Sequence, residues 1–159
     1  MINRTAFYGL ALFTAVLQTC FGFFAGFVKG FSPYLHIFGK LAGATSIATW
    51  IWLSVLMHYN RRPLSTHPFA RSLAHFTSFI ILTGIWTALA IMIASQMAYE
   101  CSVHDLWCAV GCFSSALGFL TSIFSAIAAT LVYQAAMTSG AGLEVNVAQA
   151  SRRATDIDL

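Results

Sequence analysis

Four residues late in the chain carry side chains that bind metals or form covalent bridges: Cys101, His104, Cys108 and Cys112. Two, three and three residues separate successive members. A structural zinc ion needs all four in tetrahedral reach, with the cysteines present as thiolates. In an oxidising compartment, Cys101 and Cys108 would instead form a disulfide around the six residues between them. We expect this disulfide and no metal site, with Cys112 and Cys20 as free thiols.

The histidines suggest a second kind of chemistry, the axial ligation of haem. His58 and His75 stand near one end of two apolar runs, and His36 and His104 stand near the other end. Haem ligands lie within helices and face the bundle, whereas His36 and His104 fall in or beside connections. Ionisable groups are also scarce inside the apolar runs, where only Lys40 occurs. We therefore expect no cofactor and no enzymatic activity, and keep haem as a distant alternative.

The elements that must position these side chains are four long apolar runs. They cover residues 6–28, 37–57, 76–99 and 109–133. A helix of about 20 residues crosses a hydrocarbon layer of about 30 Å. The chain is 58% hydrophobic and 8% charged, with a mean hydropathy of +0.77, against roughly 25% charged residues in an ordinary globular domain. This predicts an all-α integral membrane four-helix bundle over residues 1–137 and a disordered cytoplasmic tail over residues 138–159.

The first run carries one positive charge before it, as signal peptides do. It is longer than a signal core, and it continues through Phe21, Phe23, Phe24 and Phe27 without a polar cleavage region. We expect a membrane span that is kept, with cleavage as the alternative.

Basic residues predict the orientation, because cytoplasmic connections retain them. Lys29 and Lys40 alone fall on one side of a four-span topology. The other side holds Arg4, Arg61, Arg62, Arg71, Arg152 and Arg153. Both termini are therefore expected in the cytoplasm, in the plasma membrane or a secretory-pathway membrane. The net charge of +3 lies mainly on the cytoplasmic side, where it attracts anionic lipid headgroups. We therefore expect no nucleic-acid partner.

Small residues recur at helical spacing, which permits close approach of helices in lipid. They are Gly22, Gly26 and Gly30 in the first run, Gly39 and Gly43 in the second, Gly84 and Ala88 in the third, and Gly118, Ser122 and Ala126 in the fourth. We expect these strips to build the bundle itself; alternatively, the strip of the first or fourth run faces a partner. Polar residues inside the runs are expected to pair between helices: Gln18, Thr45, Ser46, Thr49 and Gln96.

The layout resembles the MARVEL domain, and in particular the fungal MARVEL-like membrane proteins. The resemblance covers about residues 5–135 and rests on four spans with short connections. It also rests on the run CAVGCFSSA at residues 108–116, in which cysteines precede a small-residue span. It implies a non-enzymatic role in organising lateral membrane domains, membrane apposition or vesicle traffic, with lipids, other membrane proteins or further copies as partners. A small accessory subunit of a larger membrane complex is the alternative.

The tail contains one string with regulatory chemistry, Arg152-Arg153-Ala154-Thr155. Basic residues before a threonine are typical of a kinase site. A phosphate on Thr155 would offset the neighbouring positive charge and weaken contact with anionic lipid.

Overall fold

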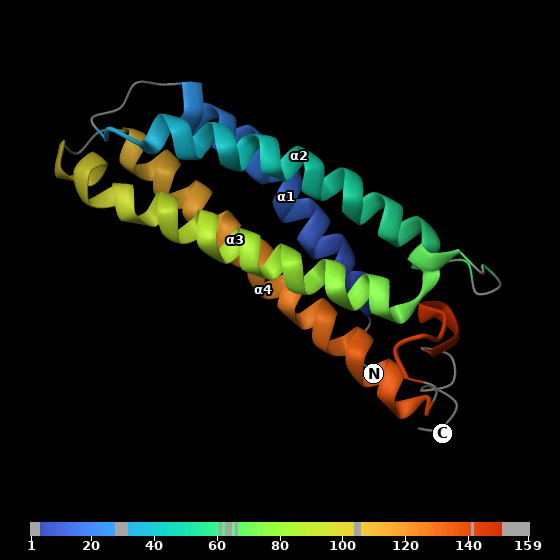
Figure 1. Cartoon of the computed structure of the whole chain (residues 1–159). Helices are drawn as coiled ribbons and strands as arrows, with labels where there is room; N and C mark the ends of the chain where they lie inside the picture. The colour runs from blue at the N-terminus through green and yellow to red at the C-terminus, as the bar shows by residue number, and fades with distance from the viewer. Residues whose placement is uncertain are drawn as a thin grey trace.

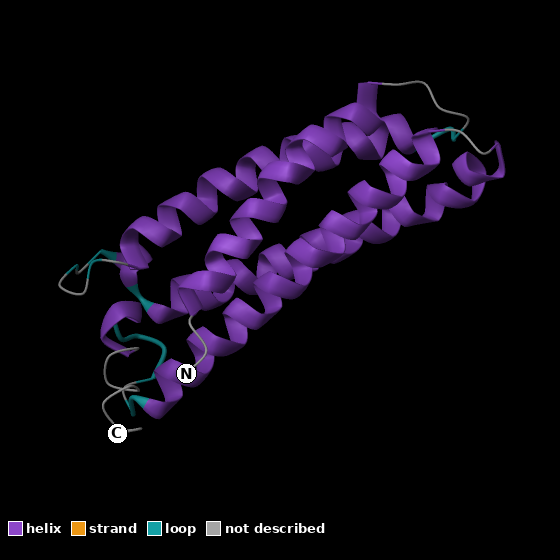
Figure 2. Cartoon of the chain, turned by 180° about the vertical axis from the view of Figure 1, so that it is seen from behind, coloured by secondary structure: helices purple, strands orange, loops and turns teal. Residues whose placement is uncertain are grey.

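The computed structural model is an all-α four-helix bundle (Figure 1). It describes residues 4–27, 32–60, 62, 65, 67–103, 106–140 and 142–150. The long helices are α1 (Arg4–Phe27), α2 (Leu35–Asn60), α3 (Ser72–Glu100) and α4 (Leu106–Thr138). Two short 3₁₀ helices, η1 (Pro68–Ala70) and η2 (Cys101–Val103), precede and follow α3. Apart from one isolated bridge between Arg71 and Asn146, the described residues form no β-structure (Figure 2).

Consecutive helices run in opposite directions, and α1 packs along both α2 and α4. Helix α3 packs mainly on α4 and contacts α2 along less of its length. The described chain begins and ends at the same end of the bundle, where Nη1 of Arg4 donates to the carbonyl of Val147 over 2.6 Å. We call this the terminal end, and the opposite end, with the α1–α2 and α3–α4 connections, the distal end.

Each predicted apolar run corresponds to one helix, and the helices extend beyond the runs by up to a few residues. All four are long and apolar enough to cross a membrane. The longest, α4, has 33 residues and is about 50 Å long at about 1.5 Å per residue. It is therefore longer than the roughly 30 Å thickness of a hydrocarbon layer.

The segment at residues 142–150 folds against the terminal end of the bundle. Backbone N–H groups of Ser72 and Leu73, in the first turn of α3, donate to the carbonyls of Val145 and Leu143, both over 2.8 Å. The first N–H groups of a helix have no partner within it, and the side chain of Arg71, which precedes α3, does not cap them. The carbonyls of the tail segment supply the partners instead. Val147 is fully buried in the main apolar cluster. The expectation of a disordered tail is therefore wrong for residues 142–150, whose apolar side chains find a site on the bundle.

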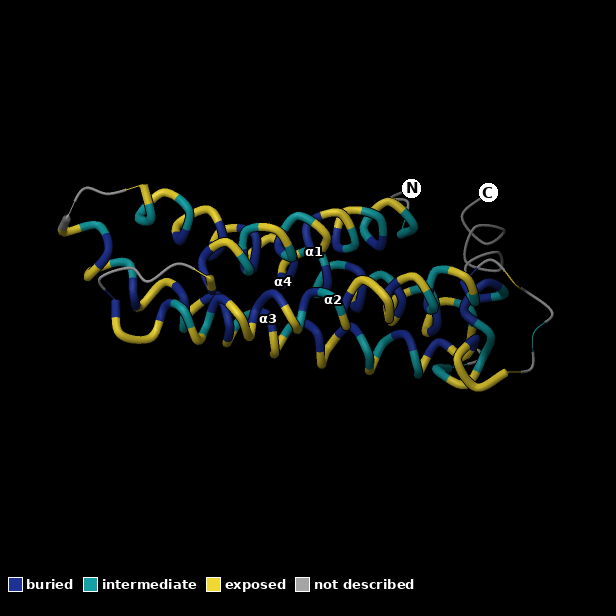
Figure 3. Tube along the Cα trace, turned by 90° about the horizontal axis from the view of Figure 1, so that it is seen from above, coloured by how far each residue is buried: buried dark blue, intermediate teal, exposed yellow. Residues whose placement is uncertain are grey.

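Buried residues follow the inward faces of the helices, and exposed residues follow the outward faces of all four (Figure 3). The larger apolar cluster occupies the terminal half and includes Trp86, Phe79 and Leu53, all fully buried. A smaller cluster around Leu35, Ala42 and Ile93 lies toward the distal end. The indole N–H of Trp86 donates to Oγ1 of Thr49 over 3.2 Å and so ties α3 to α2.

Candidate functional site

The glycines of α1 and α2 bring the backbones of these two helices close together. A Cβ built on Gly39 would stand 2.5 Å from the backbone nitrogen of Gly26, and one built on Gly22 would stand 2.9 Å from that of Gly43. No real Cβ fits at such distances from backbone. The strip predicted on the first run therefore faces α2 and is used within the bundle. Gly30 lies outside the described residues.

The strip on the fourth run faces α3. A Cβ on Gly118 would lie 3.1 Å from the Cβ of Ala90. The hydroxyls of Ser122 and Thr87 are 2.7 Å apart, and Ser122 Oγ also donates to the carbonyl of Thr83 over 3.2 Å. Ala126 is half-buried.

The small residues of the third run, Gly84 and Ala88, do not pack within the bundle as their spacing predicts. Gly84 and Ala88 are both exposed, and nothing lies within 4 Å of a Cβ built on Gly84. The expectation that this strip builds the bundle is wrong, because α3 is rotated so that Trp86 and Leu89 face inward instead. This leaves a narrow band of small side chains on the outside of α3.

Polar side chains join the helices in the interior, as expected. Nε2 of Gln18 donates to Oγ of Ser114 over 2.8 Å, between α1 and α4. Hydroxyls of Thr19 and Ser46 lie 2.8 Å apart, between α1 and α2. Of the five residues predicted to pair between helices, Gln18, Ser46 and Thr49 do so. Gln96 instead pairs with Ser32 in the α1–α2 connection and with its neighbour Ser95. Thr45 contributes only its carbonyl, which accepts from Thr49 within α2.

At the terminal end, Tyr8 and His75 form a buried pair that the sequence did not predict. The Tyr8 hydroxyl lies 3.1 Å from Nδ1 of His75, both residues are 0% exposed, and the Tyr8 ring packs on Phe79. The sequence singled out only His75, as a ligand in the haem alternative. His58, the proposed second ligand on this side, is exposed, so the two imidazoles lie in different surroundings.

At the distal end, a buried carboxylate holds the α1–α2 connection. Oε1 of Glu100, the last residue of α3, accepts from the backbone N–H of Ser32 over 2.6 Å. The hydroxyl of Ser32 donates to Oε1 of Gln96 over 2.7 Å. Glu100 is 0% exposed and its Oε2 has no hydrogen-bond partner. The predicted run 76–99 ends just before Glu100, so the sequence left this residue in the connection to the fourth run.

The cysteines expected to form a bridge do so across the α3–α4 connection. Cys101 and Cys108 are joined by a disulfide, with their Cα atoms 4.7 Å apart. The sulfur of Cys112, one turn further along α4, lies within 4.8 Å of both bridge sulfurs. Cys112 and Cys20 are the free cysteines, and both are exposed. His104 lies outside the described residues.

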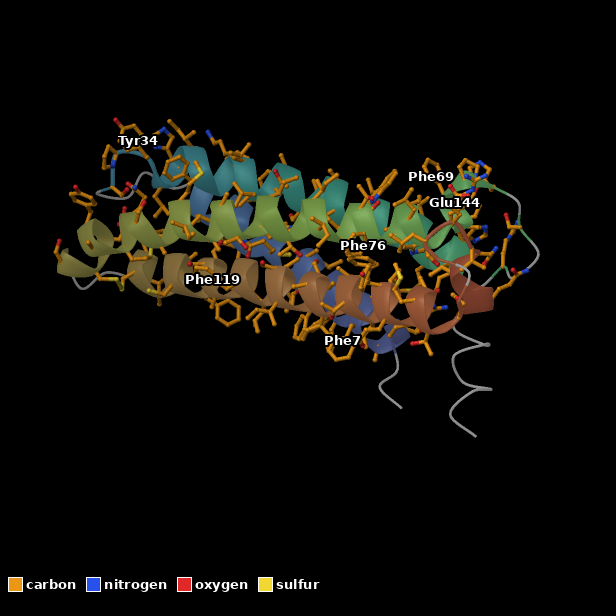
Figure 4. All side chains as sticks on the ribbon, turned by 60° about the horizontal axis from the view of Figure 1, so that its bottom comes forward. Phe7, Tyr34, Phe69, Phe76, Phe119 and Glu144 are labelled. Atoms are coloured by element: carbon orange, nitrogen blue, oxygen red, sulfur yellow. A yellow bond between two sulfur atoms is a disulfide. The ribbon has the colours of Figure 1, made fainter. Side chains whose placement is uncertain are left out.

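The outer surface of the bundle is apolar on every helix. Figure 4 shows side chains projecting outward along its whole length, with Phe119 among them. Exposed large apolar residues include Phe13, Phe24, Ile37, Ile51, Ile80, Ile91, Phe119 and Ile123. Phe23, Phe24 and Phe27 of α1 also line an open hollow of about 450 Å³ together with Thr19 and Cys20.

An aromatic group surrounds η1 at the terminal end. The ring centroid of Phe69 lies 5.5 Å from that of Trp52 and 5.1 Å from that of His67. The ring of His67 stacks on that of Tyr59, with their centroids 4.9 Å apart. The guanidinium-bearing residues beside this group, Arg62 and Arg71, are exposed. The other predicted basic residues, Arg61, Arg152 and Arg153, and the predicted phosphosite Thr155 lie outside the described residues.

No family model matches the chain, and neither a curated protein nor a solved structure matches it.

Proposed function

We propose that this chain is a multi-pass membrane protein that acts without catalysis, by gathering lipids and other transmembrane helices against its outer surface. The observation that carries the proposal is the apolar exterior of the bundle, combined with an interior in which polar side chains lie among apolar ones. Serine, threonine and glutamine side chains are bonded in the interior, while phenylalanine and isoleucine side chains cover the exterior of all four helices. In water, an apolar exterior of this extent would make the protein prone to aggregation. Against lipid chains it is solvated.

The outer surface, rather than the predicted strips of α1 and α4, provides the sites for partners. Those strips are filled by α2 and α3. The exposed band at Gly84 and Ala88 offers a place where a second helix can approach closely. The hollow beside Phe24 and Phe27 suits an acyl chain. Lateral contact with lipids and helices is also what the resemblance to the MARVEL domain implies, and four spans with short connections support it.

The terminal end has the composition of a cytoplasmic membrane interface. Trp52 and Tyr59 have the amphipathic rings that prefer the headgroup level, and Arg62 and Arg71 can contact anionic lipid. Each exposed basic residue contributes about 1 kcal/mol of attraction to such a surface. This supports cytoplasmic termini and a plasma-membrane or secretory-pathway location.

Purification from membranes in a mild detergent tests the proposal. We expect self-assembled protein with retained lipid, and glycosylation acceptors inserted in the α1–α2 or α3–α4 connection to be modified while those in the α2–α3 connection are not. Gly84→Leu is expected to weaken self-association and leave the fold intact, because its side chain meets open space. A stoichiometric larger partner would instead indicate an accessory subunit, and a bound chromophore would indicate haem.

A further inference from the structure

Three sulfur atoms converge where α3 meets α4. Cys101 comes from η2, at the end of α3, while Cys108 and Cys112 come from the first two turns of α4. Cys108 and Cys112 are four residues apart, so they project from one face of the helix. All three sulfurs lie within 4.8 Å of one another. The disulfide uses only two of them, which leaves the third without an assigned role.

The group lies beside the α3–α4 connection, at the distal end of the bundle. Cys112 is the seventh residue of α4, which places it about 9 Å from the start of the helix. It therefore lies within the first two turns after the α3–α4 connection. Cys112 is exposed, and Cys101 and Cys108 are half-buried. A small cation can therefore reach the sulfurs without crossing the bundle.

Opening the disulfide converts this group into three thiols. An external dithiol supplies two electrons and two protons: the Cys101–Cys108 bond breaks, both sulfurs become thiols, and the dithiol is oxidised to its own disulfide. A metal–sulfur bond is about 2.3 Å long, so three thiolates around one ion stand about 4 Å apart. After reduction, the sulfurs of Cys101 and Cys108 need to separate to about that distance. The Cys112 sulfur lies within 4.8 Å of both and needs to move toward them by less than about 1 Å.

The donor set favours a soft monovalent cation. Thiolates select Cu(I), zinc or iron–sulfur clusters, and structural zinc takes four ligands. Among the described residues, no fourth histidine, cysteine or carboxylate joins the group. A Cβ on Gly111, the neighbour of Cys112, would overlap Sδ and Cε of Met97, so this thioether packs against the first turns of α4.

We propose that Cys101, Cys108 and Cys112 form a Cu(I) site when the disulfide is reduced and lose it when the disulfide forms. Binding replaces three thiol protons by one cuprous ion, and the three protons are released to water. The bridge and the metal compete for the same two sulfurs. The redox state of the distal end thereby determines whether the chain holds copper.

Competition with a coloured Cu(I) chelator tests the site on the full-length protein in detergent under argon. Reduced wild-type protein is expected to remove one Cu(I) per chain from the bathocuproine disulfonate complex. The key variant is Cys112→Ser, because it leaves the Cys101–Cys108 bridge available for folding. Changes to residues that only support metal ligands weaken metal binding by up to roughly 100-fold. Cys112→Ser removes one of the three ligands themselves, so it should weaken Cu(I) binding by more than that. Cys112→Met, which keeps a soft sulfur, should retain more affinity than Cys112→Ser.

Two controls separate this site from nonspecific thiol binding. Cys20→Ser removes the other free, exposed cysteine and should leave Cu(I) uptake unchanged. Oxidised wild-type protein, with the bridge intact, should take up none. The proposal is overturned if Cys112→Ser binds as tightly as wild type, if the bridged protein binds equally well, or if the reduced protein retains Zn²⁺ but not Cu(I).

Discussion

The backbone N–H of Ser32 donates to Oε1 of Glu100, 68 residues later in the chain, over 2.6 Å in a fully buried position. This bond joins the connection after α1 to the end of α3, two elements that are not consecutive. The hydroxyl of Ser32 reinforces it by donating to Gln96 and by accepting, over 3.3 Å, from the N–H of Leu35 at the start of α2. One serine thus ties the end of α3 to the start of α2 at the distal end.

Glu100→Ala should lower the free energy of unfolding by about 1–3 kcal/mol, because it leaves a buried backbone N–H unpaired. Glu100→Gln keeps an acceptor oxygen and should cost less. Thermal unfolding in detergent, followed by circular dichroism, measures both. Glu144→Gln is the matched control, since Glu144 is exposed. If all three variants unfold at the wild-type temperature, the distal contact contributes nothing.

Gly39→Ala should destabilise the bundle by about 1–3 kcal/mol, since the added methyl meets the backbone of Gly26 and α1 must move away from α2. Gly84→Ala adds the same methyl in open space, and helix propensity there favours alanine by up to about 1 kcal/mol. Opposite signs of the two changes in unfolding temperature are expected. Equal effects would contradict the assignment of the α1–α2 contact.

Tyr8→Phe should cost about 1 kcal/mol, because the phenyl ring still fills the core but Nδ1 of His75 loses its partner. Tyr133, which is 44% exposed, provides the control: Tyr133→Phe should not change stability. The comparison can be made by unfolding the two variants in parallel. A Tyr8→Phe variant as stable as Tyr133→Phe would show that the buried pair is energetically neutral.

Val147→Asp should release residues 142–150 from the bundle, since a carboxylate cannot replace a fully buried valine without a partner. The N–H groups of Ser72 and Leu73 would lose the carbonyls of Val145 and Leu143. Hydrogen exchange at those two amides should therefore accelerate, which mass spectrometry detects. Glu144→Ala, in the same segment but exposed, should leave the exchange unchanged. Unaltered exchange in Val147→Asp would mean that the segment does not depend on this anchor.

Cys108→Ser should lower stability by about 2–3 kcal/mol in the chain-entropy model, given the short loop that the bridge closes. Treating the wild type with a reducing agent should have the same effect and change its mobility on a nonreducing gel. Cys20→Ser should have none, because Cys20 is a free thiol on the outside of α1. Full stability after reduction would remove any structural role for the bridge.

Several features of this protein follow from local sequence. An uncharged run of about 20 residues forms a helix whatever it packs against, so the four helices were predictable one by one. The Cys101–Cys108 bridge was predictable because a connection this short holds its ends close together. Interior serines, threonines and glutamines were expected to pair between helices, because polar groups in an apolar surrounding bond to one another. Many of the hydroxyls also donate to a carbonyl of their own helix.

The rotation of each helix about its axis was decided only by the tertiary structure. In a water-soluble bundle, the apolar stripe marks the inward face. Here the inward and outward faces are both apolar, so the sequence could not tell that Gly39 is enclosed while Gly84 is exposed. The same rotation brings Tyr8 to His75 and Ser32 to Glu100, and it places Cys112 beside a bridge that the spacing had assigned to two cysteines alone.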